Sequence, residues 1–475
     1  MIKIYSNNDK FEYDIQNLVK SFFPEKVIRL IYDESNKDTD FSVLFSDKEI
    51  LFKGNRGEFA NSCSLVQDAD RGEVKNALKR LIYKTLSSYL GKELAWGDLS
   101  GIRPTKIAMK KLEEGYSDED TIQFMQDTYC TSEEKSRLSV TIANLERKIL
   151  APLHYKDGYS LYVGIPFCPT TCMYCSFTSY SIARFSDKVS TYLTALEKEL
   201  DFVSQHFKDK ILDTVYIGGG TPTTLSADEL ERLLLAITSK FNLSHLQEFT
   251  VEAGRADSIT LDKLKVLKKY NVSRISVNPQ TMNQKTLDII GRRHSVEDVE
   301  RVFYEAREAG LDNINMDIIL GLPEEGVPEV INTCERIKNL NPDSFTVHSL
   351  AIKRASRMQE WIEKCGYKTM INTNETMAIA EAAAYEMNML PYYLYRQKNM
   401  AGNFENTGYA KKNAYGIYNI LIMEEVQTIV ACGAGTVTKR VFPDGSAKRC
   451  DTHKDVDLYI DMIDQMIDRK RQLFS

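Results

Sequence analysis

The chain has 475 residues, of which 43% are hydrophobic and 27% are charged, with a formal net charge of −6. Its length is sufficient for two or three domains, and its acidic balance argues against a general nucleic-acid-binding protein, which is usually basic. Because the N-terminal stretch MIKIYSNNDKF lacks an apolar signal segment and no apolar run approaches the roughly 20 residues of a membrane span, we expect a cytoplasmic protein without a membrane span.

The first 155 residues are expected to form a separate α/β domain. Strand-like sequence over 41–54 is followed by a helical pattern over 73–94, and a charged helix is predicted near 132–149. Pro152 and the sequence YKDGY shortly after it are typical of a domain boundary, because proline and glycine interrupt regular structure. We therefore place the end of this domain at residue 155.

Residues 156–355 alternate between short apolar or β-branched runs and amphipathic helical stretches. The predicted strands are 160–165, 213–217, 248–253, 273–278, 314–320 and 344–350, and the helices between them include 188–207, 227–241, 261–270 and 296–310. Ser226 with Glu229 and Ser295 with Asp298 form capping-box patterns at two helix starts. This alternation predicts a parallel sheet, either open and doubly wound or curved into a partial barrel.

The remaining residues, 356–475, are predicted to form a mainly helical domain. A helix is expected over 374–389 and a charged helix at the C-terminal end, with a stretch rich in tyrosine and asparagine between them. We expect the tyrosines of residues 385–418 to pack in the interior rather than to stack on nucleic-acid bases, since the chain is acidic.

Three cysteines stand close together in GIPFCPTTCMYCSF, which directly follows the first predicted strand of the parallel series. Cys168, Cys172 and Cys175 are separated by three and two residues, whereas the other six cysteines are isolated and are expected to be small buried residues. A structural zinc site needs four ligands, so zinc would require a distant fourth residue, and a catalytic zinc with three thiolates is less usual. Thiolates are the normal ligands of iron–sulfur clusters, and a cluster of four irons with three protein ligands would leave one iron free.

Glycine or polar residues recur where the predicted strands end. The glycine-rich segment Gly218–Thr223 follows the second strand, Glu252 ends the third, Gln280 follows the fourth, Asp317 lies in the fifth and Ala351 follows the sixth. Ligands of parallel α/β folds bind at the carboxyl ends of the strands. Any one of these residues alone would be an ordinary loop residue, but together they predict a binding site at one rim of the sheet.

The spacing of the three cysteines resembles the C-x3-C-x2-C signature of the radical S-adenosylmethionine (SAM) enzymes. Residues from about 158 to 440 resemble the oxygen-independent coproporphyrinogen III oxidase family, whose landmarks are matched in order by LYVGIPFCPTTCMYC, IGGGTPT, FTVEA, ISVNPQTMN, IIGRRHS, MDIILGLPEE and ACGAG. The sequences WGDLSGIRPTK and YYLYRQKNMAGNFENTGY are similar to its HemZ branch. The resemblance implies a radical-SAM partial (β/α)6 barrel over 156–355, an N-terminal HemZ-type accessory α/β domain over 1–155, and a mainly helical HemN-like domain over 356–475.

The resemblance also implies cofactors and the residues that bind them. The three cysteines would hold one [4Fe–4S] cluster, whose free iron would bind the amino and carboxylate groups of SAM, and an electron would cleave SAM to a 5′-deoxyadenosyl radical. The chain would bind one SAM molecule or two. The residues that match SAM contacts of the family are Tyr162, Tyr174, Gly219, Gly220, Thr221, Glu252, Gln280, Arg292, Asp317, Ala351 and Val437. Arg292 is the position most relevant to a second SAM.

The reaction implied by the resemblance is the oxidative decarboxylation of coproporphyrinogen III to protoporphyrinogen IX in haem biosynthesis. It would require an electron donor such as flavodoxin or ferredoxin. One departure keeps two alternatives open: the oxidase has a fourth cysteine two residues after the third, where this chain has Phe177. The alternatives are a haem- or porphyrin-binding chaperone similar to HemW, and another radical-SAM reaction on a tetrapyrrole.

A porphyrinogen substrate with four carboxylates would need cationic partners, for which arginine is the usual bidentate choice. The candidates in this sequence are Arg103, Lys353, Arg354, Arg357, Arg396 and Lys398. Each of them alone would ordinarily belong to a solvated surface. His294 and His348 lie near the predicted rim, but neither has the spacing of a metal ligand with another histidine, so we expect no metal at either.

Overall fold

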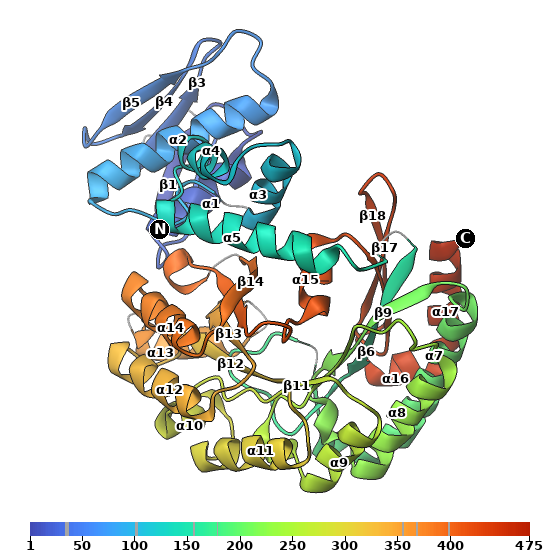
Figure 1. Cartoon of the computed structure of the whole chain (residues 1–475). Coiled ribbons are helices and arrows are strands. Elements are labelled where there is room, and N and C mark those ends of the chain that lie inside the picture. Colours follow the sequence, from blue (N-terminus) through green and yellow to red (C-terminus); the bar gives the residue numbers. More distant parts are fainter. Residues whose placement is uncertain are drawn as a thin grey trace. The chain divides into compact units, whose positions relative to one another are not determined.

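The computed structural model describes residues 1–33, 38–99, 103–154, 157–177, 179–353, 356–366, 369–397 and 400–475. The chain forms two compact units (Figure 1). The small unit consists of Met1–Asn144 and Tyr395–Glu405, and the large unit consists of Leu145–Leu394 and Asn406–Ser475. A segment from the last quarter of the sequence therefore belongs to the unit that the N-terminus begins.

The small unit contains a five-stranded sheet in the order β2-β1-β3-β4-β5, in which β2 and β3 run parallel to β1, and β3, β4 and β5 are antiparallel. The strands are β1 (Ile2–Ser6), β2 (Ile28–Ile31), β3 (Phe41–Phe45), β4 (Glu49–Gly54) and β5 (Ala60–Ser64). The helices are α1 (Glu12–Phe22), α2 (Arg71–Leu90), α3 (Pro104–Glu113), α4 (Asp118–Tyr129) and α5 (Glu133–Leu150), the last of which ends in the large unit. One apolar core joins the sheet to α1 and α2.

The returning segment of the small unit, Tyr395–Glu405, is held by buried polar contacts. The Glu405 carboxylate accepts a hydrogen bond of 2.7 Å from Trp96 Nε1 and lies 2.8 Å from Lys135 Nζ. Arg396 Nη1 donates to the carbonyl of Leu99 at 2.5 Å, and Nη2 donates to Asn403 Oδ1 at 2.9 Å. Because the Arg396 guanidinium is buried and already donates to these groups, it serves the packing of this unit rather than a substrate carboxylate.

The large unit contains an eleven-stranded sheet in the order β14-β15-β13-β12-β11-β10-β9-β6-β16-β17-β18. Its centre is six parallel strands that correspond to the six predicted ones, and this confirms the expected α/β fold with a parallel sheet. They are β6 (Gly158–Ile165), β9 (Ile211–Gly219), β10 (Glu248–Glu252), β11 (Arg274–Ser276), β12 (Ile314–Leu320) and β13 (Ser344–Ser349).

Helices cover the outer side of this parallel sheet, as Figure 1 shows. They are α7 (Val189–His206), α8 (Ala227–Lys240), α9 (Leu261–Lys269), α10 (Gln284–Ile290), α11 (Val296–Glu308) and α12 (Val327–Leu340). The predicted capping boxes are present: Ser226 and Glu229 begin α8, and Ser295 and Asp298 begin α11. Leucines and isoleucines on the inner faces of α7 and α8 are buried against the strands. Because one face of each helix is buried, apolar residues recur in the sequence at helical spacing, and this spacing predicted the helices.

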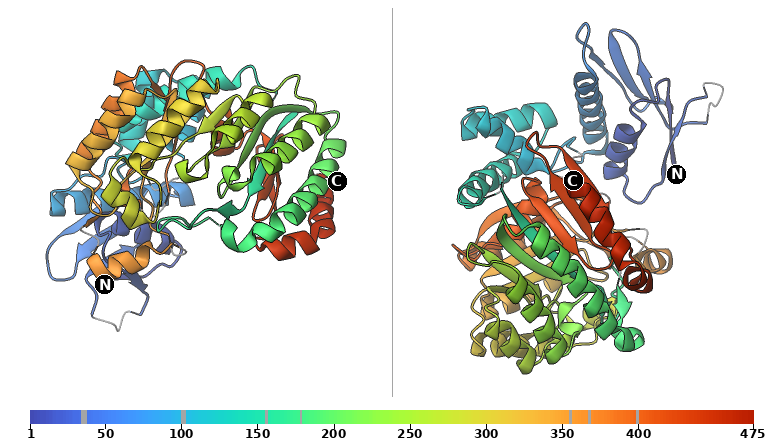
Figure 2. Two further views of the ribbon diagram at one scale, coloured as in Figure 1. Left: turned by 90° about the horizontal axis from the view of Figure 1, so that it is seen from below. Right: turned by 90° about the vertical axis from the view of Figure 1, so that its right-hand side faces the viewer.

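The C-terminal part of the chain supplies more helix than strand, but its strands complete the sheet. The helices are α13 (Met358–Cys365), α14 (Asn374–Glu386), α15 (Ile417–Glu424), α16 (Val456–Asp461) and α17 (Ile463–Phe474). At one edge, β15 (Asn406–Ala410) lies antiparallel to β13 and is followed outward by β14 (Leu390–Tyr395). At the other edge, β16 (Thr428–Cys432) runs parallel to β6, and β17 (Val437–Val441) and β18 (Ala447–Asp451) follow antiparallel. Figure 2 shows the C-terminal helices (red) alongside α7 (green).

Among the helices of the described residues, none is long and apolar enough to cross a bilayer.

Candidate functional site

The three close-spaced cysteines lie on one loop beyond the carboxyl end of β6. Cys168 ends the short strand β7 (Phe167–Cys168), which pairs with β8 (Tyr180–Ser181), while Cys172 and Cys175 follow on the loop between these two strands. The glycine-rich segment after β9 supports this loop, because Gly220 N donates to the Ile165 carbonyl at 2.7 Å and Thr221 N donates to the Phe167 carbonyl at 2.7 Å. The cysteine motif after β6 and the glycine-rich motif after β9 are therefore joined by hydrogen bonds. We call residues 168–175 the cysteine loop and residues 218–223 its glycine support.

Gly220 is required here by close approach of the backbone. A Cβ at this position would lie 2.5 Å from the Phe167 carbonyl oxygen and 3.0 Å from Cys168 Sγ. We expect Gly220→Ala to displace Cys168 and to lower the iron bound per chain by about half or more. The Phe167 carbonyl oxygen belongs to the backbone, so it cannot move away from the added Cβ unless the loop itself shifts. Iron analysis after anaerobic reconstitution measures this. Gly254→Ala is the matched control, since a Cβ there meets no atom within 4 Å, and equal iron loss in both variants would contradict the argument.

A buried arginine lies beside the second cysteine. Arg255 Nη1 points to Cys172 Sγ at 3.6 Å and donates to the Thr170 carbonyl at 2.9 Å, so one guanidinium ties the loop to the end of β10. Asp257 accepts from Arg255 Nε and Nη2 at 3.0 and 2.7 Å and fixes its orientation. Arg255 was not among the residues predicted from the sequence. The signal that could have found it is its place three residues after Glu252, at the same rim.

The donor set of the loop is three thiols, which fits an iron–sulfur cluster. Among the described side chains, no group of three or more His, Cys, Asp or Glu residues is arranged for one metal ion. A four-iron cluster binds each thiolate through a different iron, so its ligands stand farther apart than those of one ion, and thiolates are its normal ligands. Burial raises the pKa of the Cys168 and Cys175 thiols. A bound metal would reverse that preference and keep the sulfurs as thiolates.

Glu252 ends β10 next to a stack of three tyrosines. Tyr216 Oη donates to Glu252 Oε1 at 2.5 Å, and the Tyr216 ring stacks on Tyr418 at a centroid distance of 4.4 Å and on Tyr162 at 6.1 Å. Burial raises the pKa of Glu252 to about 7; the hydrogen bond from Tyr216 opposes this rise, and the nearby Asp317 carboxylate adds to it. The carboxyl group is therefore poised to ionise near neutral pH when a cationic group approaches.

If Glu252 attracts the positive charge of SAM, the affinity for SAM should depend on pH. The carboxylate form that attracts a cation is populated above its pKa of about 7 and is lost as the pH falls. We expect the dissociation constant to rise roughly tenfold from pH 8 to pH 6, while Glu252→Gln binds more weakly and shows a smaller slope, because it lacks the ionising group. Calorimetric titration of the reconstituted protein measures both. Equal slopes in the wild type and the variant would contradict this role.

Two further predicted residues meet at the neighbouring strands. Asp317 Oδ1 accepts from Asn315 Nδ2 at 2.6 Å, and Oδ2 lies 3.6 Å from His348 Nε2. Although burial opposes it, the partnership with His348 lowers the pKa of Asp317 below its usual range. Gln280 adopts a positive φ of 67° and accepts from Ile319 N at 2.9 Å, so its backbone bridges to β12.

Arg292 and Tyr174 connect the cysteine loop to the turn before α11. Arg292 Nη2 donates to Tyr174 Oη at 3.0 Å, and the buried guanidinium also donates to the carbonyls of Asn278 and Gly254. The aromatic residue just before the third cysteine is therefore held by an arginine from a distant part of the sequence.

The last predicted contacts lie at the same end of the sheet but are less enclosed. Ala351 follows β13 and is half-buried. Val437 begins β17 and its side chain is 43% exposed. The turn between β16 and β17 approaches β6 closely, because a Cβ on Gly164 would lie 2.5 Å from Thr436 Cγ2. Of the predicted residues, Thr221 contacts Cys168 Sγ and Arg292 contacts Tyr174 Oη on the cysteine loop, while Val437 is exposed.

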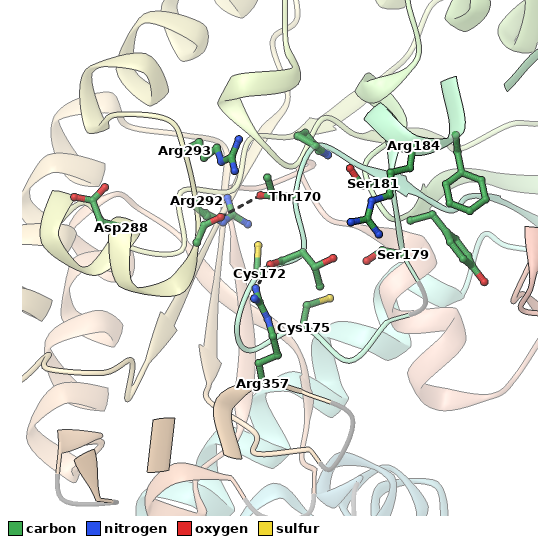
Figure 3. A pocket seen from close by; sticks show the side chains of 15 residues that line it. Thr170, Cys172, Cys175, Ser179, Ser181, Arg184, Asp288, Arg292, Arg293 and Arg357 are labelled. Atoms are coloured by element: carbon green, nitrogen blue, oxygen red, sulfur yellow. Dashed lines mark hydrogen bonds between the residues drawn. The ribbon is translucent and has the colours of Figure 1, made fainter. Parts of the chain in front are cut away.

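A cavity of about 970 Å3 opens beside the cysteine loop (Figure 3). Its described lining is rich in positive charge and includes Cys172, Cys175, Asp288, Arg184, Arg292, Arg293 and Arg357. Figure 3 shows Arg292 and Arg293 on one side of the two cysteines and Arg184 on the other. Arg357 Nη2 also donates to the Thr171 carbonyl at 2.7 Å and so supports the loop.

The other candidate substrate cations are distributed differently. Lys353 Nζ lies 5.7 Å from the ring centroid of Phe177, whose side chain is 70% exposed. Arg103 lies in the small unit, directly before α3. Arg354 and Lys398 lie outside the described residues.

Comparison with known proteins finds relatives along the whole chain. The model of the radical SAM superfamily matches residues 162–337. The chain is 36% identical to the oxygen-independent coproporphyrinogen-III oxidase-like protein HemZ of Bacillus subtilis, over 98% of its own length and 95% of that protein. It is 38% identical to the heme chaperone HemW of Bacillus subtilis over 41% of its length, which is 51% of the chaperone.

Two further similarities concern proteins of Escherichia coli. The oxygen-independent coproporphyrinogen III oxidase is 31% identical over 40% of this chain and 42% of that enzyme. The solved structure of coproporphyrinogen III oxidase (HemN), described as a radical SAM enzyme, superposes with a TM-score of 0.53 at 20% identity and covers 68% of this chain and 73% of that one. At this identity, the likeness shows the fold.

Proposed function

The chain belongs to the HemZ branch of the oxygen-independent coproporphyrinogen III oxidase family within the radical SAM superfamily, and on that premise we propose that it oxidatively decarboxylates coproporphyrinogen III. In each half-reaction, the β-carbon of a propionate loses a hydrogen atom. The resulting substrate radical then releases CO2 and transfers one electron to an acceptor. A vinyl group remains. Two propionates would react to give protoporphyrinogen IX, with one SAM consumed for each.

The superfamily implies a [4Fe–4S] cluster and SAM, which when bound supply a 5′-deoxyadenosyl radical that abstracts hydrogen. Cys168, Cys172 and Cys175 would hold the cluster. Glu252 and Asp317 would attract the positive charges of SAM from the rim of the sheet, and the glycines after β9 leave the backbone open to it. The proposal is supported above all by the way the cysteine loop, its glycine support and the ionisable Glu252 converge at the carboxyl end of one parallel sheet.

A second candidate function is haem or porphyrin binding without this chemistry. Phe177 favours it, because the side chain at this position is exposed and cannot replace the fourth cysteine of the oxidase. The similarity to a heme chaperone over 41% of the chain points the same way.

Product analysis distinguishes the two functions. The reconstituted full-length protein is incubated anaerobically with coproporphyrinogen III, SAM and a reductant, and the products are identified by mass. We expect the loss of two CO2 per porphyrinogen together with 5′-deoxyadenosine. Bound porphyrinogen with no CO2 would overturn the proposal in favour of the chaperone, and a methylated or opened tetrapyrrole would overturn it in favour of another radical-SAM reaction.

A further inference from the structure

Positively charged donors converge on the second cysteine of the cysteine loop. Arg255 Nη1 lies 3.6 Å from Cys172 Sγ, and the Arg255 side chain is only 3% exposed. Arg292 also has a hydrogen-bond and charge interaction with Cys172. Cys168 has instead the neutral hydroxyl of Thr221, which lies 3.5 Å from its sulfur. The thiols of the loop therefore differ in their surroundings, and buried positive charge is concentrated at Cys172.

A carboxylate holds Arg255 from the side away from the loop. Asp257 Oδ1 accepts a hydrogen bond from Arg255 Nε at 3.0 Å, and Oδ2 accepts one from Nη2 at 2.7 Å, so Nη1 is the nitrogen that faces Cys172. Although burial opposes it, contacts with His294 and Arg255 keep the pKa of Asp257 below its usual range, and the carboxylate is charged. The pair of Arg255 and Asp257 is therefore neutral as a whole, but its positive end faces the Cys172 sulfur.

We propose that Arg255 is a positioning residue that raises the reduction potential of the cluster on the cysteine loop, and that Asp257 limits this rise. The proposal rests on the cluster that the superfamily implies and not on the reaction of a tetrapyrrole. It gives Arg255 no contact with SAM or substrate, because the three guanidinium nitrogens already face Asp257, Thr170 and Cys172. Arg255 would act on the cluster through the Cys172 sulfur.

The direction of the effect follows from charge. A cluster gains one negative charge when it is reduced, so a nearby positive charge and an N–H donor to a ligand sulfur both stabilise the reduced state. Hydrogen bonds to the ligating sulfurs are one of the ways in which proteins set the potentials of iron–sulfur clusters. The Asp257 carboxylate acts in the opposite sense. Removal of the Arg255 charge and removal of the Asp257 charge should therefore shift the potential in opposite directions, whereas a merely structural role of the pair would not give opposite signs.

The test is the midpoint potential of the cluster in Arg255→Met and in Asp257→Asn, measured on the anaerobically reconstituted full-length protein without SAM or substrate. The protein is titrated with dithionite and redox mediators, and the reduced cluster is quantified by electron paramagnetic resonance. Each cluster takes one electron from dithionite and passes from the [4Fe–4S]2+ to the [4Fe–4S]+ state. The matched control is Arg232→Met, because Arg232 on α8 donates through two nitrogens, at 2.7 and 2.8 Å, to the Glu197 carboxylate on α7.

At the midpoint potential of the wild type, we expect the ratio of reduced to oxidised cluster to fall about tenfold in Arg255→Met, which corresponds to a potential lower by about 59 mV for one electron. The ratio should rise about threefold in Asp257→Asn and stay within about twofold of the wild type in Arg232→Met. An unchanged potential in Arg255→Met, or shifts of the same sign in both variants, would overturn the proposal. If Arg255→Met does not hold its iron, Asp257→Asn decides, since an unchanged or lower potential there contradicts the proposal by itself.

Failure of the proposed reaction would look different. A wild-type protein that takes up a four-iron cluster but releases no CO2 from coproporphyrinogen III would overturn the decarboxylation alone, because the potentials are measured without substrate. A wild-type protein that holds no four-iron cluster would overturn the cluster assignment and the role of Arg255 together.

Discussion

Replacing any one of Cys168, Cys172 and Cys175 by alanine should abolish SAM cleavage and remove most of the bound iron. The three thiols lie within eight positions of the sequence, whereas the other six cysteines of the chain are isolated from one another and from this loop in the sequence. Loss of one thiolate leaves a cluster with two protein ligands, which we expect to be released or degraded during anaerobic purification. Iron, sulfide and 5′-deoxyadenosine are measured on the same samples.

Cys365→Ala provides the matched control, because this cysteine is exposed on α13 and lies outside the cysteine loop. It should retain the iron, sulfide and SAM cleavage of the wild type. The assignment would be wrong if anaerobically purified wild-type protein contained zinc with neither iron nor sulfide. It would also be wrong if all three alanine variants kept their iron.

A second large effect is expected far from the cysteines, at a buried ion pair between α7 and α17. Glu199 Oε1 lies 2.5 Å from Lys470 Nζ, and both side chains are fully buried. Glu199 Oε2 accepts hydrogen bonds from Tyr459 Oη and from the Gly433 backbone N–H, each at 2.7 Å. One carboxylate thus joins the C-terminal helices to the turn that packs against Gly164.

Lys470→Met should lower the free energy of unfolding of the large unit by about 3–5 kcal/mol, because it leaves the Glu199 charge buried without its partner. The measurement is the shift of the denaturant unfolding transition. Adding Glu199→Gln should recover part of the loss, since the uncompensated charge is then removed. Recovery would not be complete, because Gln keeps hydrogen bonds but not their charge-assisted strength.

The control for this pair joins the same two helices at the surface. Lys198 Nζ lies 2.7 Å from Asp464 Oδ1, with exposed fractions of 52% and 77%. Lys198→Met should cost less than about 1 kcal/mol, because exposed ion pairs are solvated and screened. Equal destabilisation by Lys198→Met and Lys470→Met would show that burial is not the cause.

The parallel centre of the large unit could be read from the sequence because its signals are local. Each of the six strands is a short apolar run followed by a helical period, and Ser226 and Ser295 mark helix starts through contacts made within three residues. The cysteine motif and the polar residues at the strand ends could be assigned to one site, since parallel strands bring their carboxyl ends to one rim. The parallel sheet and the rim at which the candidate site lies could therefore be predicted from local signals.

Only the tertiary structure decided which distant segments complete these local elements. β15 and β16 extend the sheet because they pair with the backbone N–H and C=O groups at the edges of β13 and β6. The residues of a short strand do not indicate which sheet edge it will pair with. Arg396 was one of six candidates for a substrate contact, yet it is buried and donates to Leu99 and Asn403. The sequence determined where charge and thiols occur along the chain. Whether a charge is buried in a contact, like Arg396, or left exposed, like Arg184, depends on desolvation and on neighbours hundreds of residues away, which no local pattern encodes.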